Sequence, residues 1–221
     1  MGTDVRKLVY NGYPAERVFA ADLRQEFIDC GHELFQDADT CKIRFFATNI
    51  FDLQFPAAPV APNNDLSIIA RLEDLTGQIT HCYLGALFHL FEEEKQYDLA
   101  KRVATFVKPS PGTIIFGRHE VSPDEPKILN DLGMPSMASV LLLRIVLLVA
   151  LTDYVVDSGR FGHTTDTWKD LWTKVFTEIV SEDFAREHVI TKATTTTNWG
   201  RGEIVDTRPD WILMFWSVEI V

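Results

Sequence analysis

The sequence predicts an α/β fold with a mostly parallel sheet that ends in an antiparallel hairpin, and three observations support this. Short apolar runs typical of buried strands alternate with segments whose apolar residues recur near every 3.6 positions, as in helices. Their order over residues 2–116 is α-β-α-β-α-β-α-β, which indicates a parallel sheet. The last two apolar runs are joined by a turn-rich connection, which predicts an antiparallel pair at the sheet edge. With 221 residues, we expect one domain over residues 1–221.

Residues 17–52 form the unit around which we expect the sheet to be built. An apolar run at 18–21 ends at Asp22, a helical pattern follows, and a second apolar run at 43–47 leads into a polar turn containing Asn49. Two buried strands joined by one helix make a right-handed unit with parallel strands. Ligands of such sheets bind at the carboxyl ends of the strands. We therefore expect Asp22 and Asn49 at the edge where a nucleotide would lie.

The other elements follow from the same patterns. A strand is expected from residue 79, turning helical near Gly85, and the acidic run at 92–94 opens a helix, where it complements the helix dipole. The remaining helices are predicted over 2–11, 66–75, 92–107 and 161–180, and the remaining strands over 113–116, 189–197 and 211–221.

Composition and charge exclude several classes of function. The net charge of 21 − 32 = −11 disfavours binding to nucleic acid, because an acidic chain repels phosphate backbones. The 3 cysteines lack metal-ligand or disulfide-framework spacing, and the N-terminus lacks an apolar signal region, so we expect a cytoplasmic protein. The histidines have no spacing typical of metal ligands, and we predict no metal site.

Residues 133–157 form an atypical apolar insertion. The apolar core at 140–151 contains Arg144 and is too short for a membrane span, so we predict none. Its uniformly apolar character suits a buried helix or a contact between two copies, and a homodimer is one expectation. The segment is either a genuine insertion or a translated intron, and sequencing the transcript would decide between them.

Five segments resemble one family of enzymes. They are GTDVRKLVYNGYP at the start, AADLRQEFIDCGHELFQDAD, FFATNIFD, GALFHLFEEEKQYDLAKRVATFVKPSPGTIIFGR and FGHTTDTWKDLWTKV. In this order and spacing, the chain resembles the class I, Rossmann-like methyltransferases that use S-adenosylmethionine. Within that family it looks most like fungal enzymes that tailor meroterpenoids and polyketides.

The resemblance implies roles for particular residues. Asp22 would accept hydrogen bonds from the cofactor ribose, and Leu23 would line the adenine. Asn49 stands where the family usually has an Asp that meets the adenine amino group, and the backbone of Ile50 would lie against the ring. His89 would act as a base or orient an acidic oxygen. The alternative for His89 is a histidine packed under the sheet edge.

The chain also departs from the family. The first strand, its glycine loop and the helical lid that precedes them have no counterpart, and Gly2 is all that could remain of the loop. The resemblance therefore implies weakened cofactor binding, and the exposed strand edges that result favour pairing with another chain.

Three functions remain open at this point. The resemblance implies methyl transfer from S-adenosylmethionine to an oxygen of a small-molecule terpenoid or polyketide, either a carboxylate or a phenol. The alternatives are a cofactor-independent cyclase or isomerase on the same fold and a non-catalytic partner subunit. Dehydrogenases and nucleotide hydrolases are disfavoured, since neither G-x-G-x-x-G nor G-x-x-x-x-G-K-[ST] occurs.

Overall fold

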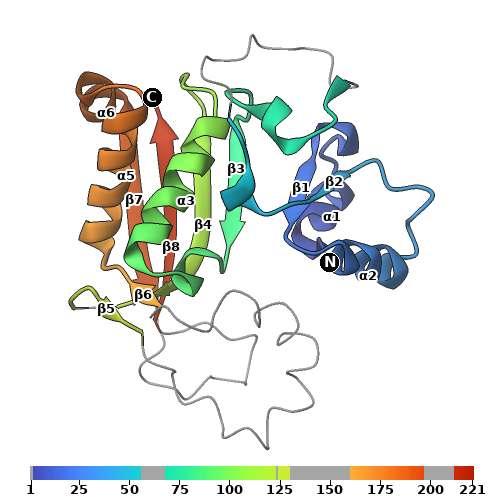
Figure 1. Ribbon diagram of the computed structural model, residues 1–221, viewed down its shortest axis with the longest axis horizontal. Helices are drawn as coiled ribbons and strands as arrows, with labels where there is room; N and C mark the ends of the chain where they lie inside the picture. Colours follow the sequence, from blue (N-terminus) through green and yellow to red (C-terminus); the bar gives the residue numbers. More distant parts are fainter. Residues whose placement is uncertain (1, 56–67, 123, 130–159, 197–211) are drawn as a thin grey trace, which may run out of the picture. The chain divides into compact units, whose positions relative to one another are not determined.

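The computed structural model describes residues 2–55, 68–122, 124–129, 160–196 and 212–221 (Figure 1). The chain divides into two compact units, Met1–Gln78 and Ile79–Val221. Both units combine helices with strands, so the predicted α/β class is confirmed. The single domain over residues 1–221 stays a prediction, and the apolar insertion at 133–157 lies outside the described residues.

The first unit contains the predicted strand–helix–strand arrangement. Strands β1 and β2 run parallel, with Phe19 opposite Arg44 and Asp22 opposite Ala47, and α2 packs against both. The apolar residue Ile28 of α2 is 4 % exposed, which anchors the helix on the strands. The elements of this unit are α1 (Thr3–Tyr10), η1 (Ala15–Arg17), β1 (Phe19–Asp22), α2 (Gln25–Phe35), β2 (Arg44–Ala47), η2 (Ile50–Asp52) and η4 (Leu72–Leu75).

One helix of the first unit is shorter than predicted. Within the described part of 66–75, only Leu72–Leu75 is helical for more than one residue, as a 3-10 turn. The carboxylate of Asp74 accepts hydrogen bonds from the backbone N–H groups of Ala70 and Arg71, at 2.9 Å each. These side-chain bonds hold the preceding backbone outside a helix, which is why the apolar pattern was misleading here.

The second unit is built on a sheet in the order β3-β4-β8-β7. Strands β3 and β4 are parallel, whereas β8 is antiparallel to both of its neighbours, and β7 lies at the edge. The predicted C-terminal antiparallel hairpin is therefore confirmed. Its elements are β3 (His81–Gly85), η5 (Phe88–Leu90), α3 (Glu93–Phe106), β4 (Ile114–Val121), β5 (Lys127–Ile128), β6 (Phe161–Gly162), α5 (Thr165–Ile179), α6 (Glu182–His188), β7 (Val189–Thr196) and β8 (Ile212–Ile220).

Strand β4 is longer than the apolar run predicted. The run covers residues 113–116, yet the strand continues to Val121 because β8 pairs with it over its whole length. The extra residues include Arg118, His119 and Glu120, whose polar character masked the strand in the sequence. This extension carries two polar side chains, His119 and Glu120, to the carboxyl end of the strand, where both are buried.

The core of the second unit lies between the sheet and the helices α3 and α5, which pack side by side (Figure 1). Large aromatic side chains are buried in this core: Phe88, Trp168 and Trp172 are each 0 % exposed. Their rings meet mostly edge to face, with Phe88 and Trp168 at 4.8 Å. The opposite side of the sheet presents exposed aromatic residues, with Tyr83 and Phe116 at 5.3 Å between ring centroids.

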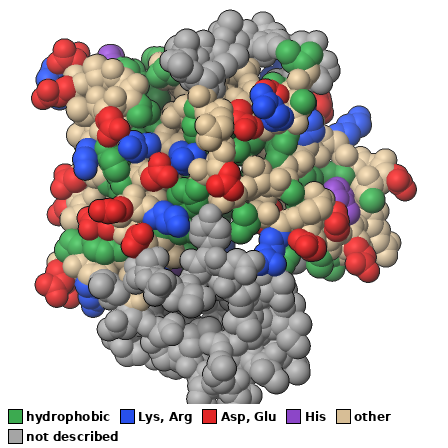
Figure 2. Space-filling model, viewed as in Figure 1, with side chains coloured by type: hydrophobic (Ala, Val, Ile, Leu, Met, Phe, Trp, Pro, Cys, Tyr) green, Lys and Arg blue, Asp and Glu red, His purple; other side chains and the backbone are tan. Residues whose placement is uncertain are grey.

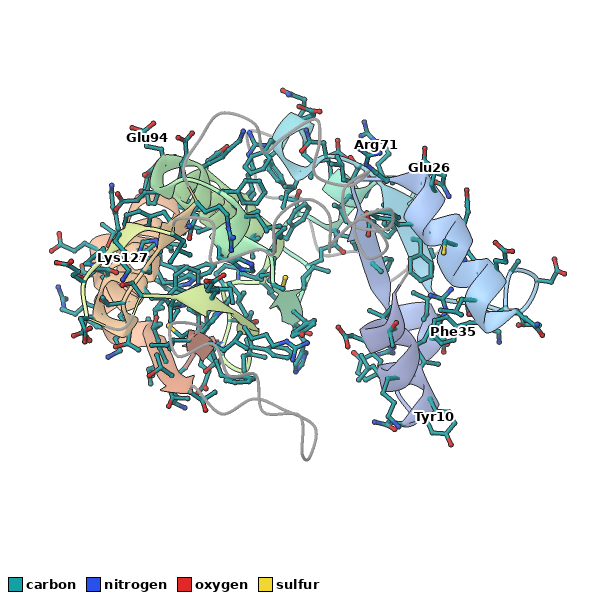
Figure 3. All side chains as sticks on the ribbon, turned by 90° about the horizontal axis from the view of Figure 1, so that it is seen from below. Tyr10, Glu26, Phe35, Arg71, Glu94 and Lys127 are labelled. Atoms are coloured by element: carbon teal, nitrogen blue, oxygen red, sulfur yellow. The ribbon has the colours of Figure 1, made fainter. Side chains whose placement is uncertain are left out.

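Many charged side chains of the second unit lie at the surface. Glu94 in the first turn of α3 and Lys127 on β5 both point outward (Figure 3). Acidic and basic side chains are interspersed over the described residues visible in Figure 2. Among the described helices, none combines the length and the apolar character that crossing a membrane requires.

Candidate functional site

In the first unit, the carboxyl ends of two parallel strands place the predicted residues at one edge. Asp22 is the last residue of β1, and Asn49 follows β2 by two positions. The Thr48 N–H donates to the Asp22 carbonyl at 2.8 Å, which continues the pairing past the end of β2. The parallel arrangement expected for residues 18–21 and 43–47 is thus confirmed.

The side chain of Asp22 holds the turn that follows its strand. Its Oδ1 accepts a hydrogen bond from the Arg24 N–H at 3.1 Å, which orients the carboxylate at the strand end. Its second oxygen has no hydrogen bond to any described residue. Leu23, next to it, is 44 % exposed. An oriented carboxylate beside an exposed apolar side chain suits a ligand with hydroxyl groups and an apolar ring.

Asn49 caps the short helix η2. Its Oδ1 accepts from the Phe51 N–H at 3.1 Å, and its Nδ2 donates to Asp52 Oδ2 at 3.0 Å. Ile50 opens the helix, so the cap sets the position of its backbone.

Gly2 precedes α1 in a left-handed conformation, with φ of 66°. A Cβ at this position would lie 2.8 Å from Cε1 of Phe45 and 2.9 Å from Nη1 of Arg6. Glycine is favoured here for two reasons: the φ angle is positive, and a Cβ atom would lie too close to the Phe45 ring. This close approach is made within the first unit, to a residue of β2, and a role for Gly2 at the cofactor stays a prediction.

In the second unit, His89 lies in η5, directly after the carboxyl end of β3. Its Nδ1 is buried and has no hydrogen bond to a described residue. Burial, with a smaller effect of the nearby Arg160 cation, lowers the pKa of His89 to about 4. At neutral pH the imidazole is therefore uncharged.

Arg160 joins His89 to the end of β4. Its Nε donates to the His89 carbonyl at 3.1 Å, and its Nη2 contacts Glu120 Oε2 at 2.7 Å. The Glu120 side chain is only 5 % exposed, so the guanidinium compensates a buried charge.

Two further buried histidines lie close by. Trp216 Nε1 donates to Nδ1 of His119 at 2.9 Å, so neutral His119 carries its proton on Nε2. Its ring is 6.5 Å from that of His89, and His163 Nδ1 lies 3.1 Å from Thr167 Oγ1. Burial lowers the pKa of His163 to about 4 and that of His119 well below its ordinary value.

These histidines make the end of β4 a second candidate site. Nε2 of His119, Nε2 of His163 and Oε1 of Glu120 are buried without a partner among the described residues. Unpaired buried polar atoms are costly, and their concentration here marks a functional candidate. The sequence analysis missed this group because its members come from separate segments. The signal in the sequence was that His89 and His163 lie within segments that resemble the family and that His119 directly follows one.

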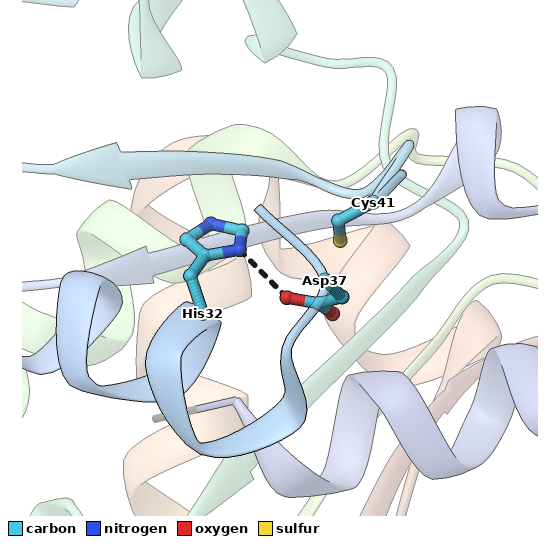
Figure 4. Close-up of side chains that lie close together, drawn as sticks. All are labelled: His32, Asp37 and Cys41. Carbon is cyan, nitrogen blue, oxygen red and sulfur yellow. Dashed lines mark hydrogen bonds and ion pairs between the residues drawn. The ribbon is translucent and has the colours of Figure 1, made fainter. Parts of the chain in front are cut away.

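A third group, in the first unit, consists of His32, Asp37 and Cys41 (Figure 4). Their possible ligand atoms lie within 4.8 Å of one another. However, Arg6 already binds both oxygens of Asp37, at 2.6 and 3.0 Å, and its Nη2 lies 3.3 Å from His32 Nδ1. A guanidinium at the centre repels a cation, so this group is explained as an ion-pair network.

Comparison with known proteins shows that the chain is similar in sequence to fungal methyltransferases. No protein-family model matches it. It is 29 % identical to the O-methyltransferase phiE of a fungal species (strain ATCC 74256), over 80 % of this chain and 47 % of the relative. It is 34 % identical to the asnovolin E/chermesin D methyltransferase nvfJ of Aspergillus novofumigatus, over 53 % of this chain and 37 % of the relative. The chain thus spans less than half the length of these relatives.

Solved structures share the fold at low sequence identity. A Burkholderia thailandensis 1,6-didemethyltoxoflavin-N1-methyltransferase with bound S-adenosylhomocysteine matches with a TM-score of 0.54 and 10 % identity, over 100 % of this chain and 67 % of that one. The [4+2]-cyclase SpnF matches with a TM-score of 0.52 and 9 % identity, over 99 % and 71 %.

The resemblance to fungal class I methyltransferases is confirmed. The Rossmann-like methyltransferase fold predicted for the chain is confirmed with it. The absence of the family's lid, first strand and glycine loop stays a prediction. So do the roles of Gly2, Asp22, Leu23, Asn49, Ile50 and His89.

Proposed function

We propose that this chain is part of an O-methyltransferase that binds S-adenosylmethionine and acts on a small terpenoid or polyketide. The observation that supports it most directly is Asp22, a carboxylate oriented at the carboxyl end of β1 with one oxygen left for a ligand. The fungal relatives named as methyltransferases support the same class of reaction.

The residues at the end of β1 and β2 fit the adenosine part of the cofactor. Asp22 would accept from the ribose hydroxyls, Leu23 and the Ile50 backbone would flank the adenine, and Asn49 would accept from its amino group. When bound, the cofactor supplies a methyl group already activated on a sulfonium, so the chain's own contribution is mainly alignment.

The low pKa of His89 favours a carboxylate over a phenol as the methyl acceptor. A base whose pKa is about 4 takes up a proton at pH 7 at a cost of about 4 kcal/mol, which makes it weak for removing a phenolic proton. A carboxylate is already ionised at this pH and needs no base. We therefore assign His89 the orienting role, as a neutral ring that directs the acceptor oxygen.

Calorimetric binding of S-adenosylmethionine tests this proposal. The wild-type chain is expected to bind in the micromolar range, and Asp22→Ala to lose binding, because the ribose hydroxyls lose their acceptor. Asp29→Ala is the matched control, since this exposed aspartate of the same unit accepts a hydrogen bond from Gln25 on the surface of α2, at 2.8 Å. Absence of heat with the wild type, or equal binding by Asp22→Ala, would overturn the assignment.

The cyclase alternative has one supporting observation, namely that a [4+2]-cyclase shares the fold. Turnover of a polyene substrate without added cofactor would favour it over methyl transfer. The partner-subunit alternative depended on the missing first strand, which stays a prediction, and on the apolar run at 140–151, which lies outside the described residues. The homodimer and the cytoplasmic location likewise stay predictions.

A further inference from the structure

Arg160 connects three segments of the second unit that are far apart in the sequence. Its Nε donates to the carbonyl of His89, 71 residues earlier, at 3.1 Å. Its Nη2 contacts Oε2 of Glu120, 40 residues earlier, at 2.7 Å. Its own carbonyl accepts from the Leu129 N–H at 2.7 Å, which ties its backbone to the strand pair β5–β6.

The short helix η5 needs such a connection to stay in place. On its apolar side, Phe88 is 0 % exposed and packs against Trp168. On the backbone side, its internal hydrogen bonds run from the Leu90 N–H to the Leu87 carbonyl and from the Phe91 N–H to the Phe88 carbonyl. Arg160 binds the next carbonyl along the chain, that of His89. A three-residue helix with two internal bonds is weak by itself, so outside contacts fix its position.

Arg160 also sets the charge around the His89 ring. Burial lowers the pKa of His89 first, and the Arg160 cation lowers it further. Among the described residues, His119 has its uncharged ring 6.5 Å from that of His89, and Glu120 is paired with Arg160. Removing the cation would remove its repulsion of the imidazolium, so the charged form of His89 would become less unfavourable.

We propose that Arg160 is a positioning residue for His89, which it fixes by bridging the His89 carbonyl and the Glu120 carboxylate. The proposal deepens the function proposed above and rests on it for the role of His89 in orienting the acceptor oxygen. The bridge needs the planar fork of arginine, because a single ammonium cannot reach two acceptors in different directions with the same geometry.

The test compares Arg160→Gln with Arg160→Lys by NMR. Amide exchange of Leu90 and Phe91 is expected to speed up about tenfold in both variants, because both lose a charge-assisted hydrogen bond that holds η5. The pKa of His89 is expected to rise above about 4 only in Arg160→Gln, and to stay below its ordinary value of 6.5 because burial, the larger cause, remains. Arg160→Lys keeps the charge, so its His89 pKa stays low.

A control variant and a replacement for the test variant complete the experiment. Arg186→Gln removes an arginine that pairs with Asp183 and Glu187 on the surface, and neither readout should change. If Arg160→Gln does not fold, Arg160→Gln combined with Glu120→Gln removes both charges and should still speed exchange and raise the pKa. Unchanged exchange of Leu90 and Phe91 in the Arg160 variants would overturn the proposal. The experiment needs no ligand, so failure of cofactor binding overturns the proposed function separately.

Discussion

Asp37 shows how a single carboxylate can stabilise the first unit. Arg6 binds both of its oxygens, and His32 Nδ1 lies 2.8 Å from Oδ1. The Arg6 side chain is 9 % exposed and that of Asp37 20 %, so the pair is only partly screened by water. The hydrogen bond from Arg6, with a smaller contribution from His32, lowers the pKa of Asp37 to about 2.

Asp37→Asn is expected to destabilise the first unit by about 1–2 kcal/mol at pH 7. Because the pKa of the folded carboxylate is below its unfolded value, its contribution is fully present above pH 3.8 and is lost as pH falls toward 2. Hydrogen exchange of peptides from α2 and β2, compared between wild type and variant from pH 7 down to about pH 2, measures the loss. Asp166→Asn, an exposed aspartate of α5, should change nothing; an equal effect of both variants would contradict this account.

The sequence analysis did not find residues whose role depends on a side-chain contact with a residue far away in the sequence. Asp22 and Asn49 were placed correctly because chain order alone puts them at the ends of neighbouring parallel strands. Arg160 and Glu120 were not found, since their contact joins side chains 40 residues apart and follows from no spacing rule. His119 was weighed only as a metal ligand, and its neutral form became evident only from the hydrogen bond with Trp216.

At the scale of elements, Gly117 controls how closely β3, β4 and β8 approach. It pairs with Leu84 of β3 on one side and with Trp216 of β8 on the other. A Cβ at this position would lie 2.0 Å from the Leu84 carbonyl oxygen and 2.8 Å from the Trp216 ring. The first of these atoms is backbone, so the strand itself would have to move.

Gly117→Ala is therefore expected to cost about 3 kcal/mol, the upper end for an inserted methyl in a packed core. Gly112→Ala is the matched control: nothing lies within 4 Å of its Cβ position, so this variant carries only the strain of a positive φ, 90°. Urea unfolding followed by tryptophan emission measures both. If the two variants unfold at the same urea concentration, close packing at Gly117 is not what determines stability there.

Elements whose apolar residues recur regularly were predicted well. Elements whose bounds depend on side-chain hydrogen bonds or on a distant partner strand were not. Of the two hairpin strands, β7 is β-branched and alternating and β8 is an apolar run, and their antiparallel pairing followed from the turn-rich connection. The helix expected at 66–75 was interrupted by the contacts of Asp74, which periodicity cannot report. The extension of β4 through Glu120 depends on pairing with β8, a partner about 100 positions away.

For the molecule as a whole, each of the two compact units has its own sheet and its own buried apolar residues. The pair β1–β2 forms one sheet, and β3-β4-β8-β7 forms another. Apolar residues such as Ile28 and Ile43 are buried in the first unit, whereas Trp168 and Val218 are buried in the second. Each unit therefore has its own source of cooperative stability, and unfolding of the chain need not be one transition.

The positions of the tryptophans allow the unfolding of the two units to be measured separately. All 5 lie between positions 168 and 216, so their emission reports on the second unit, while peptide hydrogen exchange can follow the first. We expect Asp37→Asn to speed exchange in the first unit and leave the midpoint of the tryptophan transition unchanged. Gly117→Ala should lower that midpoint and leave exchange in α2 and β2 as in the wild type. A shift of the tryptophan midpoint by Asp37→Asn, equal in free energy to its effect on exchange, would show that the units unfold together.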